Sequence, residues 1–157
     1  AIELSALYLS IKADEYYTKA LKADSAMQLQ QKKAELEKAV KLLLAADRLL
    51  QSHPSNTLQS WVALARVHGK NEQQKNYYEQ NAKRLITTWG GYQNDYAARM
   101  WSGLIRDYYI PRMRLQLSGK KKDLPAWEEA WITTPWVNKT QAFDDPLAAA
   151  IELIKNN

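Results

Sequence analysis

Cysteine is absent from the 157 residues of the chain. Its absence excludes disulfide bridges, thiolate metal sites and a cysteine nucleophile, although it does not fix the compartment. Glycine and proline number only five each, which excludes collagen-like and low-complexity sequence. No uncharged apolar run approaches the roughly 18 residues that a membrane-spanning helix needs, so we expect no membrane partner.

Several motifs that carry chemistry are missing as well. There is no glycine-rich phosphate loop and no G-x-S-x-G nucleophile elbow. The two histidines, His53 and His68, lack the spacing of metal ligands, so we expect no metal site. Glycoside hydrolysis would need two carboxyl groups facing one bond. Nothing marks such a pair among the candidates, which are Asp95, Asp107, Glu128, Glu129, Asp144 and Asp145. We interpret Asp95 and Asp145 as helix caps, and Glu128 and Glu129 as solvated.

What the sequence does contain is helical periodicity, because apolar residues recur at three- and four-residue spacing. We expect helices over 1–24, 26–51, 57–68, 71–88, 94–117, from 123 to the irregular segment 133–140, and over 145–155. Paired glycines make 89–93 a loop, and Pro111 should kink the helix that contains it. Strand signals are weak. The predicted fold class is therefore all-α, with about seven helices in a bundle or in stacked helical hairpins.

The domain organisation follows from length and from the first residues. A chain of this length is a usual size for one domain, so we treat 1–157 as a single all-helical domain. The chain opens with Ala1-Ile2-Glu3, without Met, and no signal sequence precedes the first helical pattern. We interpret it as a piece excised from a larger protein, whose destination this piece does not reveal.

Aromatic residues are distributed unevenly, with 11 of the 16 lying between Tyr77 and Trp136. Tryptophan and tyrosine combine a flat apolar face with a polar tip, which suits both sugar rings and interfaces. We interpret Trp61, Trp127 and Trp131 as core residues. Trp89 differs because it adjoins two glycines in a predicted loop, where aromatic residues more often belong to a site.

Basic residues concentrate at 99–122, where seven Lys and Arg face only Asp107, a local charge of +6 against +5 for the whole chain. Phosphate contact is one interpretation. A solvated helix face followed by a lysine turn is the other, and we favour it because no nucleic-acid-binding motif accompanies the charge.

One stretch has a specific pattern. It runs Thr88-Trp89-Gly90, Asp95-Tyr96-Ala97, Trp101-Ser102-Gly103-Leu104-Ile105 and Asp107-Tyr108-Tyr109-Ile110-Pro111-Arg112. The ordered motifs W-G, D-Y-A, G-L and Y-Y-x-P-R resemble the C-terminal helical domain of the α-N-acetylglucosaminidases, glycoside hydrolase family 89. The flanking helical segments are compatible with that family but less diagnostic.

The resemblance implies an exo-acting, retaining glycosidase that needs no metal or organic cofactor and carries its two catalytic glutamates on a (β/α)₈ barrel. It implies that the helical domain packs on the catalytic barrel of the same chain and walls the pocket for a terminal N-acetylglucosamine, without being catalytic alone. Trp89 and Tyr96 match the wall residues of the family. Tyr92 and Gln93 lie between them, in a loop that is shorter here by a residue or two.

The resemblance also implies export, periplasmic or extracellular in a bacterium and lysosomal in animal relatives. The absence of cysteine and the many lysines suggest a bacterial member. The alternative hypothesis is a freestanding helical module that binds protein or nucleic acid through segment 99–122. We favour the glycosidase domain and expect no nucleic-acid partner.

Overall fold

The computed structural model describes residues 1–89 and 94–157. This part of the chain forms seven α-helices, namely α1 (Ile2–Ser25), α2 (Leu29–Leu50), α3 (Leu58–Arg66), α4 (Glu72–Leu85), α5 (Ile110–Leu117), α6 (Leu124–Thr133) and α7 (Pro146–Lys155). Three short turns of other helix types join them, η1 (Pro54–Asn56), η2 (Ile105–Tyr109) and η3 (Lys121–Asp123). The described residues contain only one β-bridge, between Thr57 and Ser102. The predicted all-α class is therefore confirmed.

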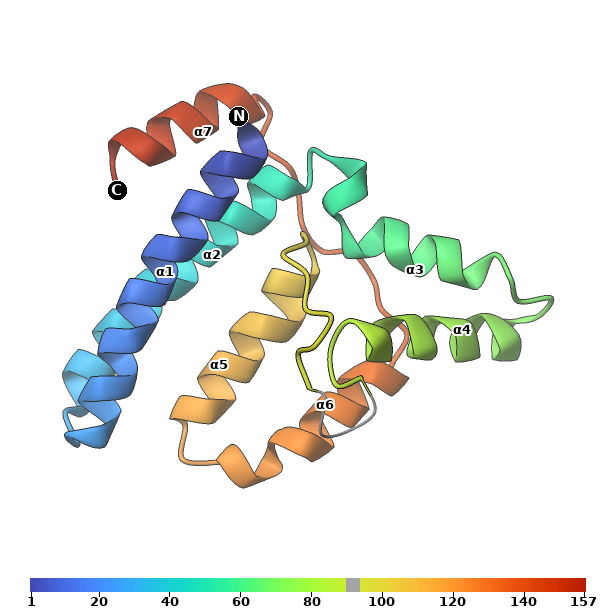
Figure 1. The fold of residues 1–157 in the computed structure, drawn as a ribbon, viewed down its shortest axis with the longest axis horizontal. Helices are drawn as coiled ribbons and strands as arrows, with labels where there is room; N and C mark the ends of the chain where they lie inside the picture. Colours follow the sequence, from blue (N-terminus) through green and yellow to red (C-terminus); the bar gives the residue numbers. More distant parts are fainter. Residues whose placement is uncertain (90–93) are drawn as a thin grey trace.

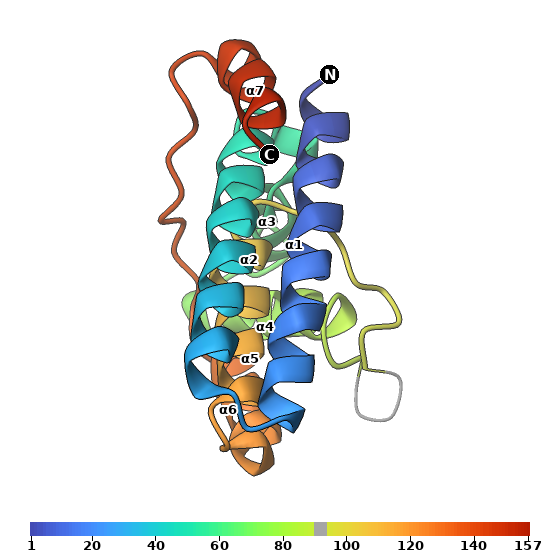
Figure 2. The same ribbon diagram turned by 90° about the vertical axis from the view of Figure 1, so that its left-hand side faces the viewer.

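The first hydrophobic core lies around the long hairpin of α1 and α2, which run side by side in both views (Figures 1 and 2). Buried alanines such as Ala13 and Ala46 let the two helices approach closely, while Leu9 and Leu49 fill the space between turns. Helix α7 crosses the N-terminal end of α1 and buries Ala150 in the same core (Figure 1).

The second core lies on the other side of α5, where α3, α4 and α6 converge (Figure 1). Leu58, Val62, Ile86, Leu104 and Tyr108 are buried there. Half-buried tryptophans pack around them, including Trp61, Trp127 and Trp131. The core assignment of these three tryptophans is confirmed.

The predicted helix over 94–117 was wrong in its first ten residues. Residues 94–103 form turns and extended chain, and helical structure starts only at Leu104. Asp95 caps no helix, because its φ is +65° and its carboxylate is bound by Arg112. Gly103, with φ +82°, adopts a left-handed conformation that also breaks a helix.

The helix that we expected to kink at Pro111 contains a π-helical turn just before the proline. Within η2, the Ile110 N–H donates to the carbonyl of Ile105, five residues earlier. Pro111 follows in the first turn of α5 and has no N–H to offer the preceding turn. The wider π-turn accommodates the proline, and helical dihedrals run from Leu104 through Ile110.

A buried carboxylate joins the hairpin to the start of this helical run. Oδ1 of Asp47, on α2, accepts from the backbone N–H groups of Gly103 (2.7 Å) and Arg106 (3.3 Å). Its Oδ2 accepts from the hydroxyl of Thr140. Asp47 therefore supplies, from another helix, the negative charge and the acceptors that a helix N-terminus lacks.

A buried lysine ties α4 to the segment after α6. Nζ of Lys83 lies 3.1 Å from Oε1 of Glu79 and donates to the carbonyls of Trp131 and Thr134. Glu79 also accepts from the Trp136 N–H and from Arg66. These contacts hold residues 134–136, the start of the irregular segment 134–145, against α4.

Candidate functional site: an aromatic pair on an exposed loop

Trp89 and Tyr96, the two pocket-wall residues that the resemblance singled out, lie together in the structure. Their ring centroids are 5.5 Å apart and the planes are tilted by 58°. The side chain of Trp89 is 38% exposed and that of Tyr96 is 76% exposed, so neither belongs to a core. Both residues combine an apolar ring with a polar tip, a combination that suits contact with a pyranose ring. The other two candidates, Tyr92 and Gln93, lie outside the described residues.

The backbone on either side of the pair is held in unusual conformations. Trp89 has φ +49° and Asp95 has φ +65°, both in the left-handed region that non-glycine residues seldom adopt. The Trp89 N–H donates to the carbonyl of Arg84, and the Asp95 N–H donates to the carbonyl of Thr87, both at 2.8 Å. These two hydrogen bonds hold the backbone of Trp89 and of Asp95 against the end of α4.

Arg112 joins this loop to α5. Its Nη1 donates to both carboxylate oxygens of Asp95, at 2.8 and 2.7 Å. Its Nε lies 2.9 Å from Oε1 of Glu128, although that N–H lacks hydrogen-bond geometry, so the contact is purely ionic. One guanidinium thus bridges an exposed loop carboxylate and a buried one.

Glu128 departs from the sequence interpretation, which treated it as solvated. It is buried on α6, where Oε1 accepts from the hydroxyl of Tyr108 at 2.9 Å. Burial raises the pKa of Tyr108, and the carboxylate of Glu128 adds to the rise. Glu129, its neighbour, is solvent-exposed as expected and pairs with Arg84. Helical spacing is the signal that separates these adjacent glutamates, because Glu128 lies four residues from both Leu124 and Ile132, the other buried residues of α6.

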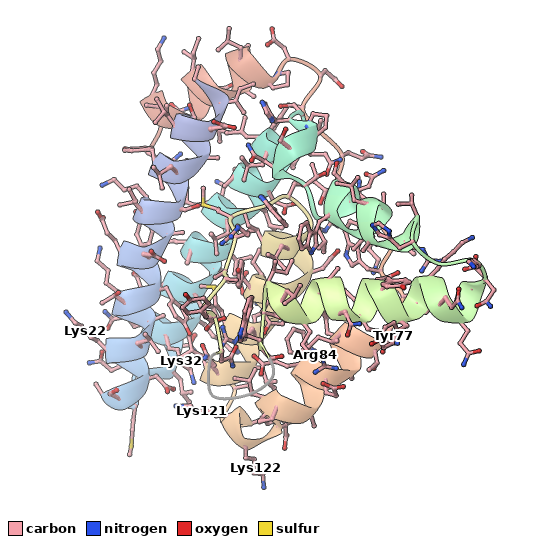
Figure 3. The ribbon with its side chains drawn as sticks, turned by 45° about the vertical axis from the view of Figure 1, so that its right-hand side comes forward. Lys22, Lys32, Tyr77, Arg84, Lys121 and Lys122 are labelled. Atoms are coloured by element: carbon pink, nitrogen blue, oxygen red, sulfur yellow. The ribbon has the colours of Figure 1, made fainter. Side chains whose placement is uncertain are left out.

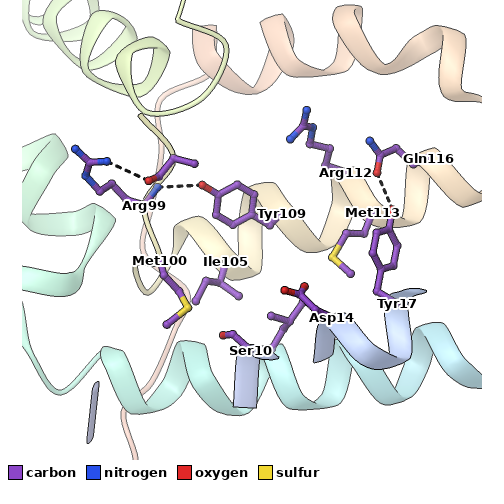
Figure 4. Close-up of a pocket in the computed structure, with 12 residues that line it drawn as sticks. Ser10, Asp14, Tyr17, Arg99, Met100, Ile105, Tyr109, Arg112, Met113 and Gln116 are labelled. Atoms are coloured by element: carbon purple, nitrogen blue, oxygen red, sulfur yellow. Dashed lines mark hydrogen bonds between the residues drawn. The ribbon is translucent and has the colours of Figure 1, made fainter. Parts of the chain in front are cut away.

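A groove of about 420 Å³ lies beside Arg112, between α1 and α5 (Figure 4). Tyr17 donates to Gln116 across one end, and Tyr109 accepts from the backbone N–H of Arg99 at the other. Burial raises the pKa of Tyr109 to about 12. Asp14 is the one carboxylate that lines this groove. The groove therefore lacks the two facing carboxylates of a glycosidase centre.

Two of the three remaining candidate carboxylates have partners elsewhere in the chain. Asp107 accepts from the indole N–H of Trp136, and Asp145 caps α7 by accepting from two backbone N–H groups, as expected from the sequence. Within residues 1–89 and 94–157, no group of three or more His, Asp or Glu is placed to hold a metal ion. None of the described helices is long and apolar enough to cross a membrane.

The arginines of the basic segment 99–122 are largely occupied within the chain. Arg112 pairs with Asp95 and Glu128, and Arg114 pairs with Glu37 on α2. Arg99 and Arg106 donate to backbone carbonyls. Lys121 and Lys122 lie on the turn between α5 and α6, and Lys122 projects from its tip (Figure 3). The segment is therefore not a continuous cationic face.

The contact of Asp95 with Arg112 was not predicted from the sequence. Both residues lie in motifs of the family pattern, D-Y-A and Y-Y-x-P-R, but 17 positions separate them. Their occurrence in the same pattern was the only signal that could have linked them. No helical spacing brings two such residues together.

Comparison with known proteins agrees with the fold and with the motifs. Residues 2–156 match the family model described as the alpha-N-acetylglucosaminidase (NAGLU) C-terminal domain. The chain is 41% identical to human alpha-N-acetylglucosaminidase over 81 residues, which make up 50% of this chain and 11% of the human protein.

Solved structures of a family 89 glycoside hydrolase from Clostridium perfringens have the same fold. The complex with 2-acetamido-1,2-dideoxynojirmycin gives a TM-score of 0.78 at 26% identity, covering 96% of this chain and 20% of that one. A double Glu-to-Gln variant in complex with its substrate GlcNAc-alpha-1,4-galactose gives 0.77 at 26% identity, covering 98% and 20%. This chain thus corresponds to about a fifth of that enzyme. Since the family model matches nearly every residue, the chain belongs to the alpha-N-acetylglucosaminidase C-terminal domain family.

Proposed function

We propose that this domain is part of an exo-acting, retaining α-N-acetylglucosaminidase, where it packs on the catalytic barrel and walls the pocket for a terminal N-acetylglucosamine. The similar enzyme from Clostridium perfringens is about five times as long, which leaves room for a catalytic domain in the same chain. That enzyme has been solved with an N-acetylglucosaminide substrate, which supports the proposed sugar.

The observation that carries the proposal is the exposed pair of Trp89 and Tyr96. An aromatic ring left in solvent gains free energy when a sugar face or a second domain covers it, by roughly 1.5–3 kcal/mol for full burial. Backbone hydrogen bonds hold Trp89 and Asp95 against the end of α4, and Asp95, next to Tyr96, is also bound by Arg112 on α5. These contacts favour a pair that is positioned before the substrate arrives. In this scheme the catalytic carboxylates come from the barrel.

The test is substitution of Trp89 by alanine in the enzyme that carries this domain. We expect Trp89→Ala to lower kcat/KM by about ten- to a hundredfold, since a decade corresponds to about 1.4 kcal/mol. Tyr77→Ala is the matched control, because Tyr77 is also exposed, at 60%, and forms a comparable ring pair with Tyr78 on α4 (Figure 3). Its activity should equal that of the unsubstituted enzyme.

Stability separates a wall residue from a packing residue. Leu104 has no exposed surface, so Leu104→Ala should lower the free energy of unfolding by roughly 2–5 kcal/mol. Trp89→Ala should cost clearly less. If both variants unfold equally readily, Trp89 is a packing residue and the proposed role in the pocket wall is wrong.

A further inference from the structure

The Trp89–Tyr96 pair is exposed to solvent, so core packing does not fix the positions of its two rings. A defined position is nevertheless needed if the rings are to bind a sugar. Tyr96 is the more exposed of the two, and the hydrophobic clusters of the described chain do not include it. The left-handed backbone at Trp89 and Asp95 is intrinsically disfavoured for residues with side chains. Such conformations persist where surrounding contacts enforce them. Some contact outside the two rings must therefore fix the loop.

The contact between Asp95 and Arg112 connects the residue before Tyr96 to helix α5. Asp95 immediately precedes Tyr96, and both of its carboxylate oxygens accept from Nη1 of Arg112. The backbone hydrogen bonds to Arg84 and Thr87 tie the loop to the end of α4. Arg112 ties Asp95 to a second element, α5.

Arg112 is itself firmly anchored. Its side chain is only 16% exposed, and its guanidinium carbon lies 5.8 Å from the centre of the Tyr108 ring. Its Nε contacts the buried Glu128, which in turn accepts from the Tyr108 hydroxyl. A continuous series of contacts therefore runs from the second core, through Glu128 and Arg112, to the residue beside Tyr96.

We propose that Arg112 is a positioning residue for substrate binding, which acts by holding Asp95 and thereby fixing the Trp89–Tyr96 pair. The proposal rests on the proposed function, because it assigns a consequence for substrate only if the pair contacts the sugar. Arg112 itself need not touch the substrate. The same helix offers a contrasting pair, Arg114 with Glu37, which links α5 to α2 on the surface.

The test uses Asp95→Asn in the complete enzyme. Asparagine has nearly the same shape and tolerates a positive φ, so the variant removes the charge without forcing a new backbone. We expect kcat/KM to fall about three- to tenfold, chiefly through a higher KM, because a displaced binding group weakens positioning. Arg112→Lys should behave alike, since lysine lacks the planar fork that lets Arg112 reach Asp95 and Glu128 from two separate nitrogens, Nη1 and Nε. Glu37→Gln, the matched control, should leave both constants unchanged.

The decisive measurement repeats Asp95→Asn in a Trp89→Ala, Tyr96→Ala background. If Arg112 acts through the aromatic pair, Asp95→Asn should cause no further loss there, whereas amide hydrogen exchange of residues 94–98 should still accelerate. Equal losses in both backgrounds, or no loss in the unsubstituted one, would overturn the positioning role while leaving the pocket wall intact. Unchanged activity of the aromatic double variant would refute the proposed function, and this inference with it.

Discussion

Lys83 and Arg84 are adjacent on α4, and both pair with a glutamate, but their surroundings differ. Lys83 has no exposed surface and is satisfied by Glu79 and two backbone carbonyls. Burial lowers the pKa of its ammonium group, and Glu79 partly opposes that shift. Arg84 lies at the surface and forms a two-pronged pair with Glu129. The contribution of each charged side chain to the free energy of unfolding therefore depends on how far it is buried, rather than on the type of residue it pairs with.

Substituting each residue tests this difference. Lys83→Met should lower the free energy of unfolding by about 3–5 kcal/mol, because it leaves a buried carboxylate short of a partner and two carbonyls without a donor. Arg84→Gln should cost less than about 1 kcal/mol, as exposed pairs usually do. Urea denaturation of the two variants provides the comparison, and similar costs would contradict the buried placement of Lys83.

The burial of Asp47 should make the free energy of unfolding depend on pH. Burial raises its pKa above the ordinary value of 3.8, although the hydrogen bonds from Thr140, Gly103 and Arg106 oppose the shift. The native state therefore holds this proton more tightly than the unfolded chain does. In the pH range just above 3.8, the contribution of Asp47 to the free energy of unfolding must fall as pH rises.

Asp47→Asn removes that titration. The Asp47→Asn variant should have a lower free energy of unfolding than the unsubstituted chain. This difference should become smaller between about pH 4 and about pH 7, because the stabilisation contributed by Asp47 falls with rising pH only in the unsubstituted chain. Denaturant melts of both proteins across that range give the measurement. A deficit that stays constant or widens would show that the pKa is not raised.

At the scale of helices and turns, Gly103 shows how one residue sets where an element begins. Its φ of +82° ends the extended segment, and its Cα faces Trp136 so closely that an added Cβ would lie 2.6 Å from Cζ2 of that ring. Trp136 cannot move aside easily, because its indole donates to Asp107 and its backbone N–H to Glu79. The helical run through η2 and α5 thus starts against a fixed aromatic ring.

Gly119 provides the control for a substitution here, since its φ is +78° and nothing lies within 4 Å of an added Cβ. Gly119→Ala should cost about 1–2 kcal/mol for the left-handed backbone alone. Gly103→Ala should cost about 1–3 kcal/mol more, from overpacking against Trp136 and Leu58. Thermal denaturation of both variants tests this, and equal melting temperatures would argue against the close contact.

The same elements show what the sequence could predict. Periodicity and local capping located α1, α2 and α7 to within a few residues, and the Asn71 cap of α4 is present as expected. The predicted helix from Asn94 failed because the chemistry that decides it is not local. Asp95 looks like a cap in sequence, but its carboxylate binds Arg112 on another element. Glu128 is different, because it occupies the face of α6 that the buried Leu124 and Ile132 share, so helical spacing alone could have placed it among the buried residues.

At the scale of the whole chain, the described residues contain two hydrophobic cores but no glycosidase centre. Asp95 and Glu128 both contact the guanidinium of Arg112, and Glu129 pairs with Arg84, so each of these candidate carboxylates is engaged by a cation of the same chain. The isolated 157-residue chain should therefore fold without being catalytic. Circular dichroism should show a helical spectrum, and an aryl α-N-acetylglucosaminide should not turn over. Turnover above a buffer blank would contradict the assignment of catalysis to another domain.

The buried carboxylate of Asp47 also bears on the order in which the chain folds. Helices α1 and α2 follow one another directly in the chain, so the contacts between them close short loops and should form early in folding. The hydrogen bonds of Asp47 should form later, because its partners Gly103 and Thr140 lie 56 and 93 residues further along the chain. Closing such long loops is what slows folding. The hairpin should therefore form early, and the locking of both cores around Asp47 should be among the last steps before the native state.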